Sequence, residues 1–178
     1  MDWVEPRAAF ALLSAAGILN CMRMLLQRVS SASVTVDGEV AGKIDKGLLL
    51  FLGIGKEDSE EQADYLLDKS INLRVFEDDS GRMNRSLMEI EGGLLIVSQF
   101  TLYAGIDRGR RPGFDQAAPP EQARKLYDYF VNIAKSRIAN VQTGVFQAHM
   151  TVSLANEGPV SIFHDSIDKR LNKSHPVR

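Results

Sequence analysis

The sequence is poor in the residues that build disulfides, metal sites and membrane spans. Its 178 residues include one cysteine, Cys21, which excludes a disulfide within the chain and a multi-cysteine zinc site. The histidines at 149, 164 and 175 show no metal-ligand spacing. No apolar run approaches the roughly 18 residues of a membrane helix. We therefore expect no metal, no cofactor and no membrane partner, and a reducing compartment such as the cytoplasm.

An excess of either charge is also missing. Lys and Arg number 21 against 23 Asp and Glu, which gives a net charge of -2. A protein that coats nucleic acid through bulk electrostatics needs a surplus of basic residues, so this class is disfavoured. A local basic patch stays open.

The first twenty-odd residues differ from the rest. Residues 8–18 form an apolar run, but Asp2 and Glu5 precede it and a good cleavage site is missing, which argues against a signal peptide. Two other interpretations are a helical extension lying on the domain, or an upstream start before a working N-terminus near Met22. We divide the chain into an N-terminal extension (1–21), a single domain (22–166) and a polar, basic tail (167–178).

Strand patterns begin the domain. Residues 25–36 alternate apolar and polar side chains, Asp37-Gly38 is a hairpin turn signal, and 39–44 is the expected returning strand. The continuous apolar run 47–55 predicts a strand that is buried on both faces.

Two helices are expected. Ser59 and Gln62 resemble a capping box, after which apolar residues keep helical spacing, and Pro120 suits the first turn of a second helix. The apolar stripe of the second helix comprises Ala123, Leu126, Tyr127, Phe130, Val131, Ala134 and Ile138.

Further strands complete the pattern. Residues 73–86 indicate a short strand and a turn, 92–103 a second continuous apolar strand that ends in polar side chains, and 143–166 the closing strands. Many strands with two main helices that do not alternate strictly with them predict an α+β fold: a single-domain sheet or partly closed β-barrel.

Motifs for familiar chemistry are weak. The segment 53–57, GIGKE, lacks Walker spacing and is better interpreted as a strand-to-helix turn. Cys21 could be a nucleophile only if the extension belonged to the active domain, and Ser98 lacks the glycines of a nucleophile elbow. The sequence therefore offers no obvious protein nucleophile.

A Gly-, Arg- and Pro-rich loop, 104–120, follows the polar strand end, and its length favours a functional loop over a linker. Arg108, Arg110 and Arg111 could bind phosphates through their guanidinium forks, or could simply be solvated. The hydroxyl and amide cluster nearby favours the first interpretation.

The last strand pattern contains an unusual interruption. Alternation before and after it is broken by Asn156-Glu157-Gly158-Pro159, and proline cannot donate to a sheet ladder.

Five segments in order carry a resemblance to a known family. They are QRVSSASVTVDGE (27–39), SQFTLY (98–103), GRRPGF (109–114), AAPPE (117–121) and NEGPVSI (156–162). Each is weak alone, but their order and spacing from about Met22 to Ser166 make the chain strongly resemble the D-aminoacyl-tRNA deacylases. The resemblance implies a homodimeric editing enzyme that hydrolyses the ester between a D-amino acid, or glycine, and the terminal adenosine of tRNA while sparing L-aminoacyl-tRNA.

The resemblance also implies roles for residues. The peptide bond of Gly158-Pro159 would be cis, and the dipeptide would enter the partner's active site, where its carbonyl oxygens face the substrate's α-amino group and leave no room for an L side chain. Asn156 and Met150 would also contact substrate. The expected catalytic residues are Ser98, Gln99, Phe100, Thr101 and Ser161. Arg108, Arg110 and Arg111 would contact tRNA.

The resemblance further implies catalysis assisted by the 2′-hydroxyl of the terminal ribose, with the protein positioning a water, which suits a chain without an obvious nucleophile. Two departures stand out: Ser161 replaces the usual threonine, and His149 precedes Met150 where an acidic residue is expected. Serine keeps the hydroxyl that a nucleophilic mechanism would need, so the mechanism stays open. The alternative is a non-catalytic RNA-binding module of the same fold, against which the intact Gln99 and Pro159 argue.

Overall fold

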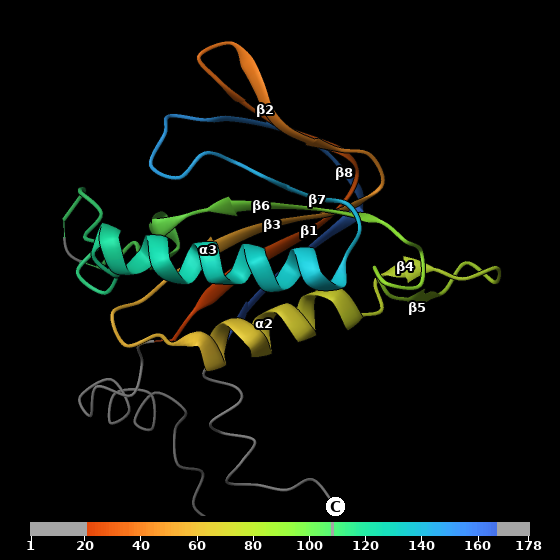
Figure 1. The fold of residues 1–178 in the computed structure, drawn as a ribbon, viewed down its shortest axis with the longest axis horizontal. Coiled ribbons are helices and arrows are strands. Elements are labelled where there is room, and N and C mark those ends of the chain that lie inside the picture. The colour runs from red at the N-terminus through yellow and green to blue at the C-terminus, as the bar shows by residue number, and fades with distance from the viewer. Residues whose placement is uncertain (1–20, 108, 167–178) are drawn as a thin grey trace, which may run out of the picture.

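A computed structural model describes residues 21–107 and 109–166. The expected N-terminal extension lies outside the described residues except for Cys21. The tail and Arg108 also lie outside them. Figure 1 shows two helices side by side across one face of a sheet. In chain order the elements are β1 (Arg23–Val36), β2 (Glu39–Ile44), β3 (Gly47–Gly53), α2 (Glu60–Asn72), β4 (Phe76–Glu77), β5 (Met83–Arg85), β6 (Gly93–Ser98), the 3₁₀ turn η1 (Phe100–Tyr103), α3 (Pro120–Arg137), β7 (Val141–Thr143) and β8 (Thr151–Asp165).

The long strand β1 organises the sheet, whose order is β2-β1-β3-β6-β7 with β8 also on β1. The first half of β1 pairs antiparallel with β3, its second half with β2, and nearly its whole length with β8. The strands β3, β6 and β7 are parallel neighbours. The sheet is therefore mixed.

The sheet curls until it nearly closes. A Cβ atom added to Gly42 of β2 would lie 2.5 Å from the carbonyl oxygen of Thr143 of β7, so the two ends of the sheet approach each other. The enclosed apolar side chains are Val29, Ala32, Val34, Ile44, Leu49, Leu95 and Val97. This arrangement confirms the predicted α+β fold with a partly closed barrel and two main helices.

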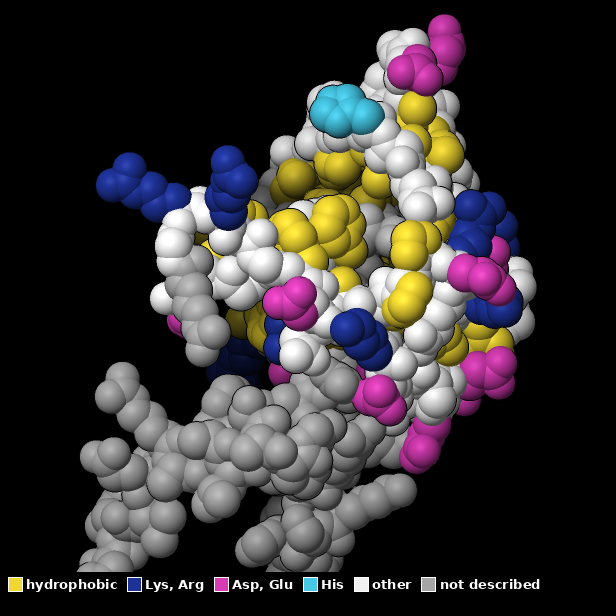
Figure 2. All heavy atoms as spheres, turned by 90° about the vertical axis from the view of Figure 1, so that its left-hand side faces the viewer, with side chains coloured by type: hydrophobic (Ala, Val, Ile, Leu, Met, Phe, Trp, Pro, Cys, Tyr) yellow, Lys and Arg dark blue, Asp and Glu magenta, His cyan; other side chains and the backbone are white. Residues whose placement is uncertain are grey.

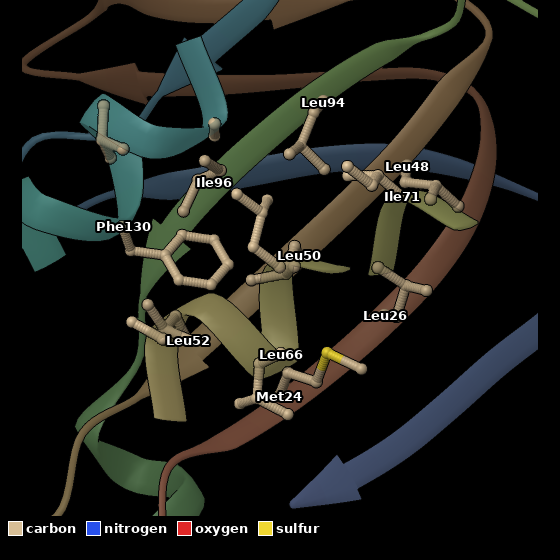
Figure 3. Close-up of a cluster of buried hydrophobic side chains, with 14 of the residues drawn as sticks. Met24, Leu26, Leu48, Leu50, Leu52, Leu66, Ile71, Leu94, Ile96 and Phe130 are labelled. Atoms are coloured by element: carbon tan, nitrogen blue, oxygen red, sulfur yellow. The ribbon is translucent and has the colours of Figure 1, made fainter. Parts of the chain in front are cut away.

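The larger core lies between the sheet and the helices (Figure 3). Phe130 of α3 and Leu66 of α2 meet side chains of β3 and β6 such as Leu50 and Ile96. Fully burying a side chain of this size contributes about 1.5–3 kcal/mol. Since Leu49 points into the barrel while Leu50 points toward the helices, β3 is buried on both faces, as its continuous apolar sequence predicted.

Most local predictions are confirmed. Asp37 and Gly38 form the β1–β2 turn with positive φ, the Gln62 side chain accepts a hydrogen bond from the Ser59 amide (2.9 Å) at the start of α2, and Pro120 begins α3.

Within the described part of the chain, no helix is long and apolar enough to cross a membrane.

One local prediction was wrong. Strand β6 ends at Ser98, and the chain then turns into η1, although 92–103 was expected to be one strand. The interruption expected at Asn156–Pro159 is present, because these residues lie on a bulge of β8 where its register against β1 shifts.

Candidate functional site

A pocket of about 580 Å³ lies where β6 ends, on the face that Figure 2 shows as a hollow surrounded by hydrophobic side chains. Its lining includes Ser98, Gln99 and Phe100 from the strand end. Phe114 and Phe146 add apolar walls. An apolar cavity with a few polar groups at one edge is the usual form of a small-ligand site.

The polar edge of the pocket is built by the passage from β6 to η1. Ser98 stands beside Leu52 of β3, and the Gln99 amide donates to the Leu52 carbonyl (2.8 Å), so the sheet fixes the backbone up to this point. The chain then turns, and Gln99 Nε2 donates to Thr101 Oγ1. Phe100 lies at the rim with an edge-to-face contact to Phe114, their ring centroids 4.9 Å apart.

The segment before β8 forms the opposite wall. Met150 and the exposed His149 line the pocket. A Cβ atom at Gly144 would lie 2.7 Å from the Met150 sulfur, so a side chain at this position would displace the Met150 side chain. Met150, expected to contact substrate, is therefore at the pocket.

The arginine-rich loop is pinched at its base. The amides and carbonyls of Gly105 and Gly113 pair with each other at 2.8 and 2.9 Å. The exposed Arg110 and Arg111 are carried on the segment between them. Figure 2 shows basic side chains projecting beside the hollow. Arg108, the third expected tRNA contact, lies outside the described residues.

Gly158 and Pro159 do not line this pocket. Their peptide bond is cis, and both residues are exposed on the bulge of β8. Val152, near the start of β8, lines the pocket, but the bulge does not, and two strands, β1 and β3, separate β8 from β6. Within the single chain, Gly158-Pro159, which is predicted to exclude L side chains, and the predicted catalytic residues at the end of β6 do not come together.

Side-chain hydrogen bonds close the bulge. Asn156 Oδ1 accepts the Val160 amide (2.8 Å), and Asn156 Nδ2 donates to Ser161 Oγ (2.9 Å). Gln27 Nε2 of β1 donates to the same hydroxyl (3.0 Å). Ser161 therefore lies at the bulge with Asn156 and not among the residues that line the pocket of its own chain.

Arg28, which the sequence analysis did not single out, supports the bulge from below. Its side chain is 6% exposed and lies opposite the residues that bulge out of β8. Its Nε donates to the Glu157 carbonyl (3.0 Å), its Nη1 donates to the Val75 carbonyl, and its Nη2 is 4.0 Å from a Glu77 carboxylate oxygen. Nothing in the sequence marks an arginine in a strand as buried; its partners come from distant segments.

The described residues contain no cluster of three or more His, Cys, Asp or Glu side chains that could hold a metal ion. Near the pocket, burial raises the pKa of the Tyr103 hydroxyl far above its ordinary value, with Asp58 adding to the effect. Burial likewise raises the pKa of the Cys21 thiol to about 11. Neither group ionises readily at neutral pH.

Comparison with known proteins gives the family. The family model for D-Tyr-tRNA(Tyr) deacylase matches residues 25–165. The D-aminoacyl-tRNA deacylase of Thermosipho africanus strain TCF52B is 54% identical over 145 residues, which cover 82% of this chain and 97% of the relative.

Two solved structures resemble the fold. The structure of a c-Myc DNA unwinding element binding protein is 39% identical, with a TM-score of 0.76, and the match covers 80% of this chain and 97% of the other. The structure of a probable eukaryotic D-amino acid tRNA deacylase is 17% identical, with a TM-score of 0.71 and coverage of 82% and 99%, and shares the fold. From the family model and the relatives together, the chain belongs to the D-Tyr-tRNA(Tyr) deacylase family.

Proposed function

We propose that this protein edits aminoacyl-tRNA by hydrolysing the ester of D-aminoacyl-tRNA, and of glycyl-tRNA mischarged on tRNA-Ala, while sparing L-aminoacyl-tRNA. Deacylase activity on D-aminoacyl-tRNA is the function of the family to which the chain belongs, so the protein is a hydrolase. The finer statements concern chirality, glycine, the dimer and the roles of individual residues.

The observation that carries the proposal is the position of Gly158 and Pro159. They stand exposed on the β8 bulge, braced by Arg28 and Asn156, and do not line the pocket of their own chain. Among the described strands β8 pairs with β1 alone, which leaves its other edge free. A free edge of this length favours pairing with another copy. In a homodimer in which the bulge enters the partner's pocket, Gly158 and Pro159 would contact the substrate bound there.

Selection would then come from exclusion. A braced main-chain wall beside the α-carbon leaves no room for an L side chain, but it admits a D side chain pointing the other way and glycine with none. This is why the same pocket should hydrolyse glycyl-tRNA. Gly158 and Pro159 would form this wall. In the pocket that the bulge enters, Met150 would contact the substrate.

For the chemistry, Ser98, Gln99, Phe100 and Thr101 would contact the reacting ester. The amides of Phe100 and Thr101 precede the first internal hydrogen bond of η1, from Leu102 to Gln99, so the turn does not use them. Each donor aimed at a developing oxyanion contributes about 2.7–4 kcal/mol. A positioned water, assisted by the 2′-hydroxyl of the terminal ribose, would attack the carbonyl.

Ser161 is proposed to act through the bulge. Its hydroxyl already accepts hydrogen bonds from Asn156 and Gln27, which ties it to the shape of the wall. Arg110 and Arg111 are proposed to contact tRNA phosphates beside the pocket, and the cytoplasm is the proposed compartment because a lone cysteine suits a reducing one.

The test is hydrolysis of D-Tyr-tRNA, L-Tyr-tRNA and glycyl-tRNA-Ala in parallel, with EDTA in one arm. We expect rapid turnover of the D and glycyl esters, little of the L ester, and no effect of the chelator. Equal rates for D and L esters would refute the exclusion mechanism. A protein that binds tRNA but hydrolyses none of the three would be a binding module.

A further inference from the structure

The 3₁₀ turn η1 is held at its end by a buried side chain that does not line the pocket. Tyr103, the last residue of η1, is 3% exposed. Its hydroxyl donates to the Cys21 carbonyl and lies 3.4 Å from Asp58 Oδ2. The same Asp58 oxygen accepts the Gly55 amide at 2.6 Å. The hydroxyl therefore ties the turn to the chain before β1 and to the loop after β3.

A second tie comes from the first residue of β1. Arg23 Nη1 donates to the Leu102 carbonyl at 2.9 Å. The guanidinium carbon of Arg23 lies 4.6 Å from the centroid of the Tyr103 ring, a cation–π geometry. Arg23 thus holds both the backbone of η1 and the ring that ends it.

The turn rests directly on the backbone of β3. A Cβ atom on Gly53 would lie 3.1 Å from the Gln99 carbonyl oxygen and 3.1 Å from Leu102 Cβ. A Cβ atom on Gly55 would lie 2.9 Å from the Tyr103 hydroxyl. Close approach of this kind needs glycine, and it leaves η1 little room to shift toward the strand.

We propose, on the basis of the hydrolase function proposed above, that Tyr103 and Arg23 are positioning residues that fix Gln99, Phe100 and Thr101 for ester hydrolysis. The Tyr103 hydroxyl does not line the pocket and stays protonated because it is buried, so it acts through the turn and not on the substrate. A misplacement of about 1 Å in a catalytic group can lower a rate about 100-fold.

The main variant is Tyr103→Phe, which removes the hydroxyl and keeps the ring under Arg23. Its matched control is Tyr127→Phe, because Tyr127 is also a buried tyrosine whose hydroxyl donates to a backbone carbonyl, that of Ile96 (2.9 Å). Both variants lose a buried hydroxyl that donates to a backbone carbonyl, so any general effect of lower stability should appear in both. Arg23→Met, with Arg23→Lys as the conservative rescue, tests the second tie.

Two readouts separate positioning from stability. In D-Tyr-tRNA hydrolysis, we expect Tyr103→Phe to lower kcat at least tenfold with KM changed less than twofold. In amide hydrogen exchange, we expect the Leu102 and Ala104 amides, which donate to Gln99 and Thr101 carbonyls, to exchange at least tenfold faster. We expect Tyr127→Phe to keep kcat within twofold, Arg23→Met to lower kcat at least fivefold, and Arg23→Lys to recover part of that loss.

The outcomes are distinct. If the wild type is active and Tyr103→Phe keeps its kcat, or loses no more than Tyr127→Phe loses, the positioning role is refuted while the hydrolase function stands. If Tyr103→Phe does not fold, the Arg23 pair decides: unchanged kcat in Arg23→Met overturns the proposal. A wild type without esterase activity overturns the proposed function itself, and with it this role in hydrolysis.

Discussion

The guanidinium of Arg28 lies directly beneath Gly158. Arg28 Nε donates to the Glu157 carbonyl at 3.0 Å, and a Cβ atom built on Gly158 would lie 2.8 Å from Arg28 Nη2. Gly158 also has φ of +122°, a conformation that residues with side chains rarely adopt. The position is therefore closed to side chains for two independent reasons.

Because Arg28 is buried and also bonds the Val75 carbonyl, the bulge of β8 is coupled to the segment that leads into β4. A charged group in this position is tolerated because Nε and Nη1 donate to carbonyl oxygens and Nη2 lies 4.0 Å from a Glu77 carboxylate oxygen. The result is a main-chain wall braced from inside the domain, which suits a filter that works by steric exclusion.

Gly158→Ala should damage both the wall and the fold. The strained conformation and the approach to Arg28 together should lower the free energy of unfolding by about 1–3 kcal/mol. Displacement of the wall should lower kcat/KM for D-Tyr-tRNA by about 100-fold. Gly81→Ala is the matched control, since Gly81 also has positive φ (+73°) but has open space around its Cβ position. Equal activity in the two variants would contradict a role specific to Gly158.

Substitutions at Ser161 distinguish a support from a nucleophile. If its hydroxyl braces the bulge with Asn156 and Gln27, we expect Ser161→Ala to lower kcat for D-Tyr-tRNA less than about tenfold and to raise the relative rate for L-Tyr-tRNA. Ser161→Thr, which keeps the hydroxyl, should restore both values. Loss of a true nucleophile instead reduces kcat by several orders of magnitude. Steady-state kinetics on both enantiomers, with no acyl-enzyme burst expected, would decide.

Periodicity and capping patterns in the sequence predicted the scaffold well, because they report burial and local hydrogen bonding. The alternation before Asp37-Gly38 gave a hairpin, and Ser59 and Gln62 marked the start of α2. The same signal misled beyond Ser98, where the apolar run continues although the strand does not. Leu102 and Tyr103 are apolar because η1 packs on Gly53, and hydrophobicity alone does not distinguish a packed turn from a strand.

The site could be predicted only in part, for a physical reason. Ser98 and Gln99 belong to one continuous segment, and both line the pocket because chain neighbours stay close. The aromatic walls at Phe114 and Phe146 come from loops with no periodic pattern, and Arg28 is defined by partners about fifty and about 130 residues away. Contacts between distant segments leave no local signature in one sequence.

Removal of a basic side chain beside the pocket should weaken tRNA binding in a salt-dependent way. For Arg110→Ala, we expect lower affinity and a slope of log K against log salt that is smaller by about 0.9 or less, as for the loss of one phosphate contact. Arg137→Ala is the control, because Arg137 is a basic residue at the end of α3 remote from the pocket, paired with Asp68. Unchanged affinity and slope in Arg110→Ala would count against this contact.

The Cys21 thiol should react slowly and should link stability to alkaline pH. Burial, with the Asp165 carboxylate adding to it, raises the pKa of the thiol from 9.0 to about 11. At pH 8 the thiolate fraction should be about 100-fold smaller in the folded than in the unfolded protein, and so should the rate of reaction with a disulfide reagent. The folded form holds the proton more tightly, so its stabilising contribution is present below about pH 9 and lost as pH rises toward 11. Fast labelling of native protein at pH 8 would contradict this pKa.

Mixed dimers give the sharpest test of the shared site. In the proposed arrangement, a subunit carrying Gln99→Ala still offers an intact wall, and a subunit carrying Pro159→Ala still offers an intact pocket. Each variant alone should be nearly inactive, since every site then contains the defect. The two variants are mixed in equal amounts, unfolded together and refolded. About half of the dimers are then hybrids, and each hybrid has one fully intact site.

We therefore expect the mixture to regain about a quarter of the wild-type rate on D-Tyr-tRNA, because half of the dimers each contribute one of two sites. The control is a double variant with Gln99→Ala and Pro159→Ala in the same chain, mixed with wild type. There the hybrid pairs each intact half with a defective one, so the mixture should show only the activity of its wild-type dimers. If the wall instead served its own chain, the first mixture would stay inactive and the hybrids of the second would keep one working site.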